Sequence, residues 1–272
     1  MPTTTAADGT AIHYTDRGEG PPVLFVHGTF MSGDVWAHQH PAFPDSRTLA
    51  LDCRGHGASE PADDYSLDAY ASDLRAVLDD AGVETATLVG WSNGAKASAR
   101  FAVDHPDRVA ALCLVSSNTF HGAAPPDVRE PQRDHLDYEE FLADLRRDWP
   151  GATRRFLDVL FAPDVPETTR EWVHRITLRF PLHAVLGHYE GVGALTDADY
   201  RRLVAALAET DHPTMVCHGA LDSSATLDEA RAVAERLDAR FVAFEESAHF
   251  PFLTDVERFN GALASFLDAT RP

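Results

Sequence analysis

A chain of 272 residues, 44% hydrophobic and 24% charged, is long enough to bury a core of its own, so we expect a folded protein and not a disordered one. Its formal net charge of −20 argues against a protein that binds nucleic acid or an anionic membrane, because both require a positively charged surface. The first ten residues lack the features of a secretory signal, and no run approaches the ~18 apolar residues of a membrane span, so we expect a cytoplasmic protein.

The first predicted element is a hairpin. Residues 8–20, DGTAIHYTDRGEG, alternate apolar and polar side chains between Gly9 and Gly18. This alternation is typical of a strand with one solvated face, and glycines favour the turns at its ends. We therefore expect an antiparallel hairpin at the edge of a sheet.

Six short apolar runs follow and predict further strands. The runs are continuous and do not alternate, which is typical of strands covered by helices on both faces. Helical patterns lie between several of them, and the one at residues 66–82 has Ser66 as its expected N-cap. This order predicts an α/β protein with a mostly parallel sheet. The runs are residues 21–28, 47–55, 85–92, 109–117, 213–221 and 240–247, and the other helices are residues 93–105, 227–237 and 256–267.

The strand pattern stops after residue 119 and returns at Pro213. A helical insertion of residues 120–208 explains the gap, and residues 1–119 together with 209–272 then form one core domain. A helical extension of the core itself is the alternative. The expected helices of this stretch are residues 137–148, 151–162, 166–178 and 196–208.

Ser92 is the candidate nucleophile. It stands between Gly90 and Gly94 in TLVGWSNGAKAS, residues 87–98, at the end of a predicted strand and before a predicted helix. The pattern G-x-S-x-G is weak evidence alone, but a sharp strand-to-helix turn needs small neighbours and lifts the serine hydroxyl clear of the sheet. Here both the strand and the helix are expected.

A serine hydroxyl needs a base, and the base needs a group to orient it. Asp222 and His249 each follow a predicted strand, so both are expected at the same edge of the sheet as Ser92. Asp228 is the rival of Asp222, but it lies in the following helix and is expected to be a first-turn acid.

The chain resembles the α/β-hydrolase fold family over nearly its whole length. The segments that carry the resemblance are VLFVHGTFMSGDVW, LDCRGHGAS, GWSNGA, HGALDSSATLDEA and AHFPFLTDVERFNGALASFL. The resemblance implies a mostly parallel eight-stranded sheet flanked by helices, with an inserted helical cap over the active site. It implies Ser92 as nucleophile, His249 as general base and acid, and Asp222 as the carboxylate that orients His249. The small capped esterases, perhydrolases and enol-lactonases are the most similar branches.

The resemblance also implies an oxyanion hole of two backbone N–H groups. One belongs to Asn93, directly after the nucleophile, and the other is assigned to Thr29, which follows His27-Gly28. Phe30 is the alternative for the second donor. Further candidates for the pocket are Phe30, Trp91, Lys96, His183 and His188.

Lys96 is the only lysine of the chain and stands four residues after Ser92. The family is usually apolar or small at this position, and a cation in the first turn opposes the helix dipole by about 0.3–1 kcal/mol. One hypothesis is that Lys96 receives an anionic group of the substrate. The alternative, which we favour from the sequence, is a stem packed along the sheet with its ammonium in water or paired with an acid.

No metal or cofactor is expected. The chain lacks H-E-x-x-H, paired Cys and His spacings, a phosphate loop and a dinucleotide-binding G-x-G-x-x-G after a strand. Cys53, Cys113 and Cys217 are odd in number and widely spaced, so buried reduced thiols are expected. The expected partner is a small-molecule substrate, with no nucleic acid and no membrane, and the oligomeric state is left open.

A serine nucleophile argues against the relatives that use an aspartate, the haloalkane dehalogenases and epoxide hydrolases. It favours a hydrolase that cleaves a small ester, lactone or related carbonyl compound through an acyl-enzyme. Two alternatives stay open. One is a lyase or cyclisation catalyst of secondary metabolism, and the other is a non-catalytic ligand receptor that retains the triad.

Overall fold

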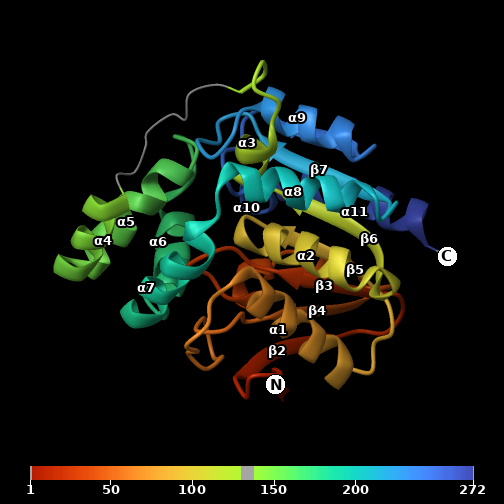
Figure 1. The fold of residues 1–272 in the computed structure, drawn as a ribbon, viewed down its shortest axis with the longest axis horizontal. Helices are drawn as coiled ribbons and strands as arrows, with labels where there is room; N and C mark the ends of the chain where they lie inside the picture. Colours follow the sequence, from red (N-terminus) through yellow and green to blue (C-terminus); the bar gives the residue numbers. More distant parts are fainter. Residues whose placement is uncertain (1, 130–137, 272) are drawn as a thin grey trace.

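The computed structural model describes residues 2–129 and 138–271 and contains one eight-stranded sheet in the order β1-β2-β4-β3-β5-β6-β7-β8 (Figure 1). All pairs from β4 to β8 are parallel, whereas β1 and β2 are antiparallel to their neighbours. The predicted sheet and edge hairpin are therefore confirmed. The strands are β1 (Thr3–Thr5), β2 (Ala11–Arg17), β3 (Pro22–Val26), β4 (Arg47–Leu51), β5 (Ala86–Trp91), β6 (Val109–Val115), β7 (Thr214–Gly219) and β8 (Arg240–Phe244).

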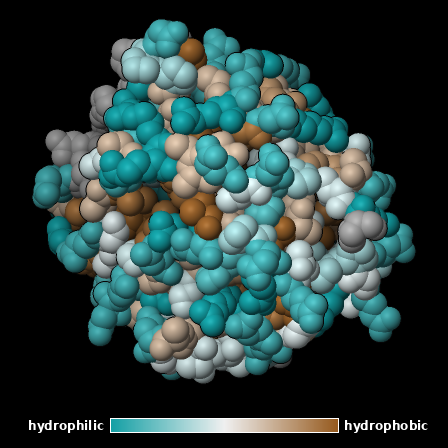
Figure 2. Space-filling model, turned by 45° about the vertical axis from the view of Figure 1, so that its right-hand side comes forward, coloured by the Kyte–Doolittle hydropathy of each residue, from teal (hydrophilic) through white to brown (hydrophobic). Residues whose placement is uncertain are grey.

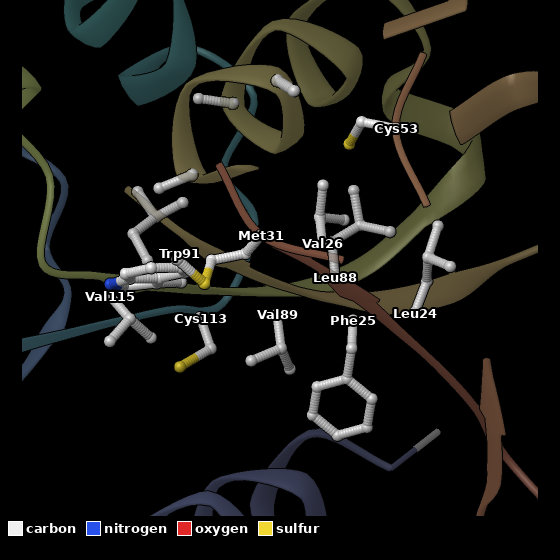
Figure 3. Close-up of a cluster of buried hydrophobic side chains, with 14 of the residues drawn as sticks. Leu24, Phe25, Val26, Met31, Cys53, Leu88, Val89, Trp91, Cys113 and Val115 are labelled. Carbon is white, nitrogen blue, oxygen red and sulfur yellow. The ribbon is translucent and has the colours of Figure 1, made fainter. Parts of the chain in front are cut away.

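The central strands are apolar throughout because helices cover both faces of the sheet. Every residue of β5 and β7 is buried. Figure 3 shows Leu88 and Val89, which are neighbours in β5, pointing to opposite sides of the sheet, each toward a helix. This packing explains why the sequence of these strands shows no alternation.

The core helices begin and end close to their predicted limits. Helix α1 (Leu67–Asp80) begins after Ser66, whose side chain accepts a hydrogen bond from the Ala69 N–H. Helix α2 (Asn93–Asp104) begins directly after Ser92. Helices α9 (Leu227–Arg236) and α11 (Val256–Thr270) also lie close to their predicted limits, whereas the short α10 (Pro251–Thr254) was not predicted. Short 3₁₀ turns lie at Gly33–Trp36, His40–Ala42, Pro106–Arg108 and Val192–Ala194.

In the described residues between β6 and β7 there are six helices, and they differ in what they pack on. Helices α3 and α8 contact α9 and α2, beside the sheet, whereas α4 to α7 gather to one side of it, at the left of Figure 1. The division of the chain into a core and a cap at residues 120 and 208 stays a prediction. The six are α3 (Thr119–Ala123), α4 (Tyr138–Arg147), α5 (Trp149–Leu160), α6 (Glu167–Thr177), α7 (Leu182–Gly191) and α8 (Asp197–Ala208).

Phe30 anchors these outer helices to the sheet. Its side chain is fully buried, and five aromatic rings surround it at centroid distances between 5.2 and 6.5 Å. Edge-to-face and tilted arrangements of this kind stabilise aromatic packing. The loop that follows β3 is thereby fixed against the helices above it. The five rings are those of Phe141, Trp149, Phe156, Phe180 and Tyr189.

The hydrophilic surface and the buried cysteines are those expected from the sequence composition. On the face shown in Figure 2, hydrophilic side chains predominate and apolar ones are scattered among them. Cys53, Cys113 and Cys217 are all free and buried, as predicted. Across the described residues, no helix combines the length and the apolar character that crossing a membrane requires.

Candidate active site

Ser92 lies at a sharp turn between β5 and α2. Its backbone has φ 55° and ψ −114°, a region that residues other than glycine rarely adopt. The Ser92 N–H donates a hydrogen bond to the Val115 carbonyl at 2.9 Å, which joins the turn to the neighbouring strand. The side chain is half-buried. The turn therefore holds a strained serine at the carboxyl end of the sheet.

The two glycines beside Ser92 are required by close contacts. A Cβ atom on Gly94 would lie 2.1 Å from the Val26 carbonyl oxygen, and one on Gly90 would lie 2.4 Å from the Gly94 carbonyl oxygen. Real Cβ atoms do not come this close to backbone atoms. The turn can form in this packed environment only when both positions lack a side chain.

We expect Gly94→Ala to lower the free energy of unfolding by about 1–3 kcal/mol, the usual cost of forcing a methyl group into a packed site. The matched control is Gly261→Ala in α11, where an added Cβ meets nothing within 4 Å. This control should raise the free energy of unfolding by about 0.5–1 kcal/mol, because alanine loses less entropy in a helix. Urea unfolding measures both, and equal stability of Gly94→Ala and the parent would contradict the packing explanation.

Asp222 and His249 are joined by a hydrogen bond. The Nδ1 atom of His249 lies 2.8 Å from Oδ2 of Asp222, and both side chains are buried. Asp222 follows β7 and His249 follows β8, so two neighbouring parallel strands bring them together. The other carboxylate oxygen accepts a hydrogen bond from the Ser224 N–H at 2.8 Å.

The carboxylate of Asp222 is held in its ionised form. Burial by itself raises the pKa of Asp222. The imidazoles of His249 and His218 and the Ser224 N–H outweigh burial, so the pKa of Asp222 lies well below its usual range. His218, in β7, is a further neighbour, and its Nδ1 atom lies 3.7 Å from Oδ2 of Asp222.

Contacts from two directions hold the backbone of His249. Trp91, the residue before Ser92, donates from its indole Nε1 to the His249 carbonyl at 2.7 Å. The His249 N–H donates to the carbonyl of Leu160, the last residue of α5, at 3.1 Å. The indole thus places His249 beside the turn that carries Ser92. Within the described residues the Ser92 hydroxyl has no hydrogen-bond partner, so it is not hydrogen-bonded to His249 in this structure. The bond between a catalytic serine and its base is often looser before a substrate binds.

The loop after β3 lies directly against Ser92. A Cβ atom on Gly28 would lie 2.8 Å from Cβ of Ser92, so Gly28 allows the loop this close approach. Thr29 follows, and its hydroxyl lies 2.9 Å from Nε2 of His188 on α7. Tyr70 of α1 holds the other ring nitrogen of His188 at 2.8 Å. A histidine of α7 thus ties the predicted oxyanion loop to α1, a link that no local pattern of the sequence could reveal.

His188 is a buried neutral imidazole. Burial first, and then the positive charge of Lys96 and the neighbouring His27, lower the pKa of His188 to about 3. His183, on the same helix, is exposed to solvent, which disfavours the pocket role considered for it. Trp91 is buried, and its indole supports His249.

The surroundings of Lys96 differ from the arrangement favoured from the sequence, an ammonium in water or paired with an acid. Its side chain is buried, so the ammonium is not in bulk water. In the part of the chain that the structure describes, no acidic group forms an ion pair with it. The Nζ atom lies 5.3 Å from the centre of the Tyr200 ring on α8, a contact that the sequence did not indicate.

In the described ranges, no group of three or more His, Cys, Asp or Glu side chains could hold a metal ion.

An eight-stranded, mostly parallel sheet with a strand-to-helix serine turn at its carboxyl edge defines an α/β hydrolase. A sequence model of the α/β hydrolase fold family matches residues 21–256, so the chain belongs to this family and is an enzyme of the α/β hydrolase type.

Known relatives extend this comparison. A non-heme chloroperoxidase of Streptomyces lividans is 31% identical over 98% of this chain and 99% of its own length. A pimeloyl-[acyl-carrier protein] methyl ester esterase of Aromatoleum aromaticum is 30% identical over 87% of this chain and 94% of its own. Among solved structures, an enzyme that degrades N-acyl homoserine lactones matches with a TM-score of 0.79 and 26% identity, covering 97% of this chain and 100% of its own.

Proposed function

We propose that this enzyme is a serine hydrolase that cleaves a small ester or lactone through an acyl-enzyme, with Ser92, His249 and Asp222 as its catalytic triad. The observation that carries the proposal is the buried 2.8 Å hydrogen bond between Asp222 and His249, held beside the turn of Ser92 by the Trp91 indole. Relatives named as an esterase and as a lactone-degrading enzyme support the substrate class.

In the proposed reaction, Oγ of Ser92 attacks the carbonyl carbon while His249 accepts the hydroxyl proton. His249 then donates this proton to the leaving oxygen, and an acyl group stays on Ser92. A water molecule, deprotonated by His249, attacks the acyl carbon, and His249 returns this proton to Oγ of Ser92 as the bond to the acyl group breaks and the acid is released. Asp222 stays ionised throughout and stabilises the positively charged imidazole, which fits its lowered pKa.

The negative charge on the carbonyl oxygen is stabilised by the N–H groups of Asn93 and Thr29. Asn93 begins α2 directly after the nucleophile, so its N–H also lies at the positive end of the helix dipole. Thr29 directly follows Gly28, which lies against Ser92 with no room for a side chain between them, and this favours Thr29 over Phe30. Each such donor contributes roughly 3–4 kcal/mol to the stability of the transition state.

Covalent labelling tests this function directly. The purified protein is incubated with a fluorophosphonate, and peptide mapping by mass spectrometry locates the adduct. We expect one adduct, on Ser92, in the folded protein and none in a heat-denatured control. The unlabelled protein should hydrolyse a panel of short p-nitrophenyl esters and simple lactones, and the labelled protein should not. An unlabelled Ser92 in a protein that is folded would overturn the proposal.

A further inference from the structure

Lys96 is a buried cation without a compensating anion. Its exposed fraction is 7%, and it is the only lysine of the chain. Among the residues that the structure describes, no acceptor forms a hydrogen bond with its ammonium and no carboxylate forms an ion pair with it. The ammonium instead lies over the face of the Tyr200 ring. A cation–π contact offsets only part of the cost of removing an ammonium from water. None of the described residues accepts a hydrogen bond from its three N–H donors.

The position of Lys96 directs this charge toward the candidate active site. Side chains of residues i and i+4 share one face of a helix, and long side chains lean toward its N-terminus. The N-terminus of α2 is the turn that carries Ser92. Tyr200, which the ammonium contacts, lies in the first turn of α8, and that helix packs against α2.

The neighbourhood of Lys96 is polar but uncharged. Its positive charge acts on His188, whose ring is held between Thr29 and Tyr70. The charge of Lys96 thus acts on the histidine that is hydrogen-bonded to Thr29, in the loop that presents the predicted oxyanion donor. These neighbours cannot neutralise it, because a hydroxyl, a phenol and a neutral imidazole carry no negative charge. A positive charge in such surroundings is suited to an anionic group brought by a ligand.

We infer that Lys96 binds a free carboxylate of the substrate, so that the enzyme prefers esters or lactones whose acyl part carries a second, ionised carboxyl group. This inference rests on the proposed function for the position of the reacting carbonyl at Ser92. It names the substrate class as half-esters of dicarboxylic acids and carboxylated lactones. A buried ammonium and carboxylate form a strong charge-assisted hydrogen bond, because water no longer competes for either group.

The kinetic test compares monomethyl glutarate with dimethyl glutarate, which differ by one charge. We expect the parent enzyme to favour the half-ester in kcat/KM, and Lys96→Met to lower this preference by about 10- to 100-fold. The matched control is Arg100→Met. Arg100 carries the same charge one turn further along α2 but pairs with Asp68 and Asp104 at the surface. Its loss should leave the preference unchanged. Monomethyl succinate and adipate then define the preferred spacing between the two groups.

A binding measurement keeps the test independent of hydrolysis and of the folding of Lys96→Met. Calorimetric titration of Ser92→Ala, in which Lys96 is intact, should show the half-ester binding about tenfold or more tightly than the diester. Equal affinities would overturn the inference, as would an unchanged preference in Lys96→Met. Failure of the fluorophosphonate to label Ser92, alongside a retained preference in binding, would instead contradict the proposed function and leave the carboxylate site standing.

Discussion

Ser92→Ala is expected to lower kcat/KM for a short ester by roughly 10⁵- to 10⁶-fold, because the triad acts as a unit and loses nearly all its effect with its nucleophile. The residual rate should stay above that of water, since the oxyanion donors and the binding surface are retained. The measurement is initial-rate hydrolysis of a p-nitrophenyl ester, with circular dichroism to verify the fold.

Ser98→Ala is the matched control for this variant. Ser98 lies on the same helix, and among the described residues its buried hydroxyl has no hydrogen-bond partner. Its removal should change the rate by less than about threefold, since surface or unpaired groups away from the site carry little energy. Comparable losses in both variants would indicate damage to α2 and not the loss of a nucleophile.

The two alternative functions predict other outcomes, one in the Ser92→Ala variant and one in the parent protein. A lyase or cyclisation catalyst that forms no acyl-enzyme would retain much of its turnover. A ligand receptor on this scaffold would hydrolyse nothing in the ester panel, while a ligand raised its melting temperature through preferential binding to the native state. The same protein preparation therefore distinguishes all three functions.

Much of this fold could be predicted from sequence because its determinants are local. The runs that became β5 and β7 are apolar at every position, a direct consequence of burial on both faces. The turn at Ser92 was predictable because Gly90 and Gly94 meet backbone atoms that leave no room for a Cβ. Helix α7 was not predicted. It carries Gly187, and glycine disfavours a helix. The glycine is needed there because the Tyr65 ring packs against it, and an added Cβ would lie 2.7 Å from that ring.

The surroundings of the candidate site depended on contacts between distant parts of the chain. Nothing near Lys96 in sequence indicates that Tyr200 would lie over its ammonium. The link from Thr29 through His188 to Tyr70 joins a loop and two helices that are far apart in the chain. Periodicity identifies which face of a helix is buried, but not which side chain it meets. These contacts needed the three-dimensional structure.

Asp222→Asn is expected to lower kcat by about 10⁴-fold with little change in overall shape. An amide at this position can donate to Nδ1 of His249, which favours the tautomer that cannot accept the Ser92 proton at Nε2. It also removes the negative charge that stabilises the imidazolium formed in the reaction. Asp228→Asn is the matched control, because Asp228 is exposed in the first turn of α9 and should lose little activity. A strong loss in Asp228→Asn with a mild one in Asp222→Asn would reverse the assignment of the acid.

The same variant should change how stability depends on pH. The pKa of Asp222 is lower in the folded protein than its unfolded value of about 3.9, so the ionised carboxylate stabilises the native state above that value. This contribution is lost as the pH falls below about 4 toward the depressed folded pKa, because protons then bind the unfolded chain more readily. Urea unfolding at pH 7, 5, 4 and 3 should therefore show the stability difference between the parent and Asp222→Asn shrinking only at the acidic end. A difference that stayed constant with pH would mean that Asp222 is not selectively ionised in the native state, and its role in orienting His249 would then rest on shape alone.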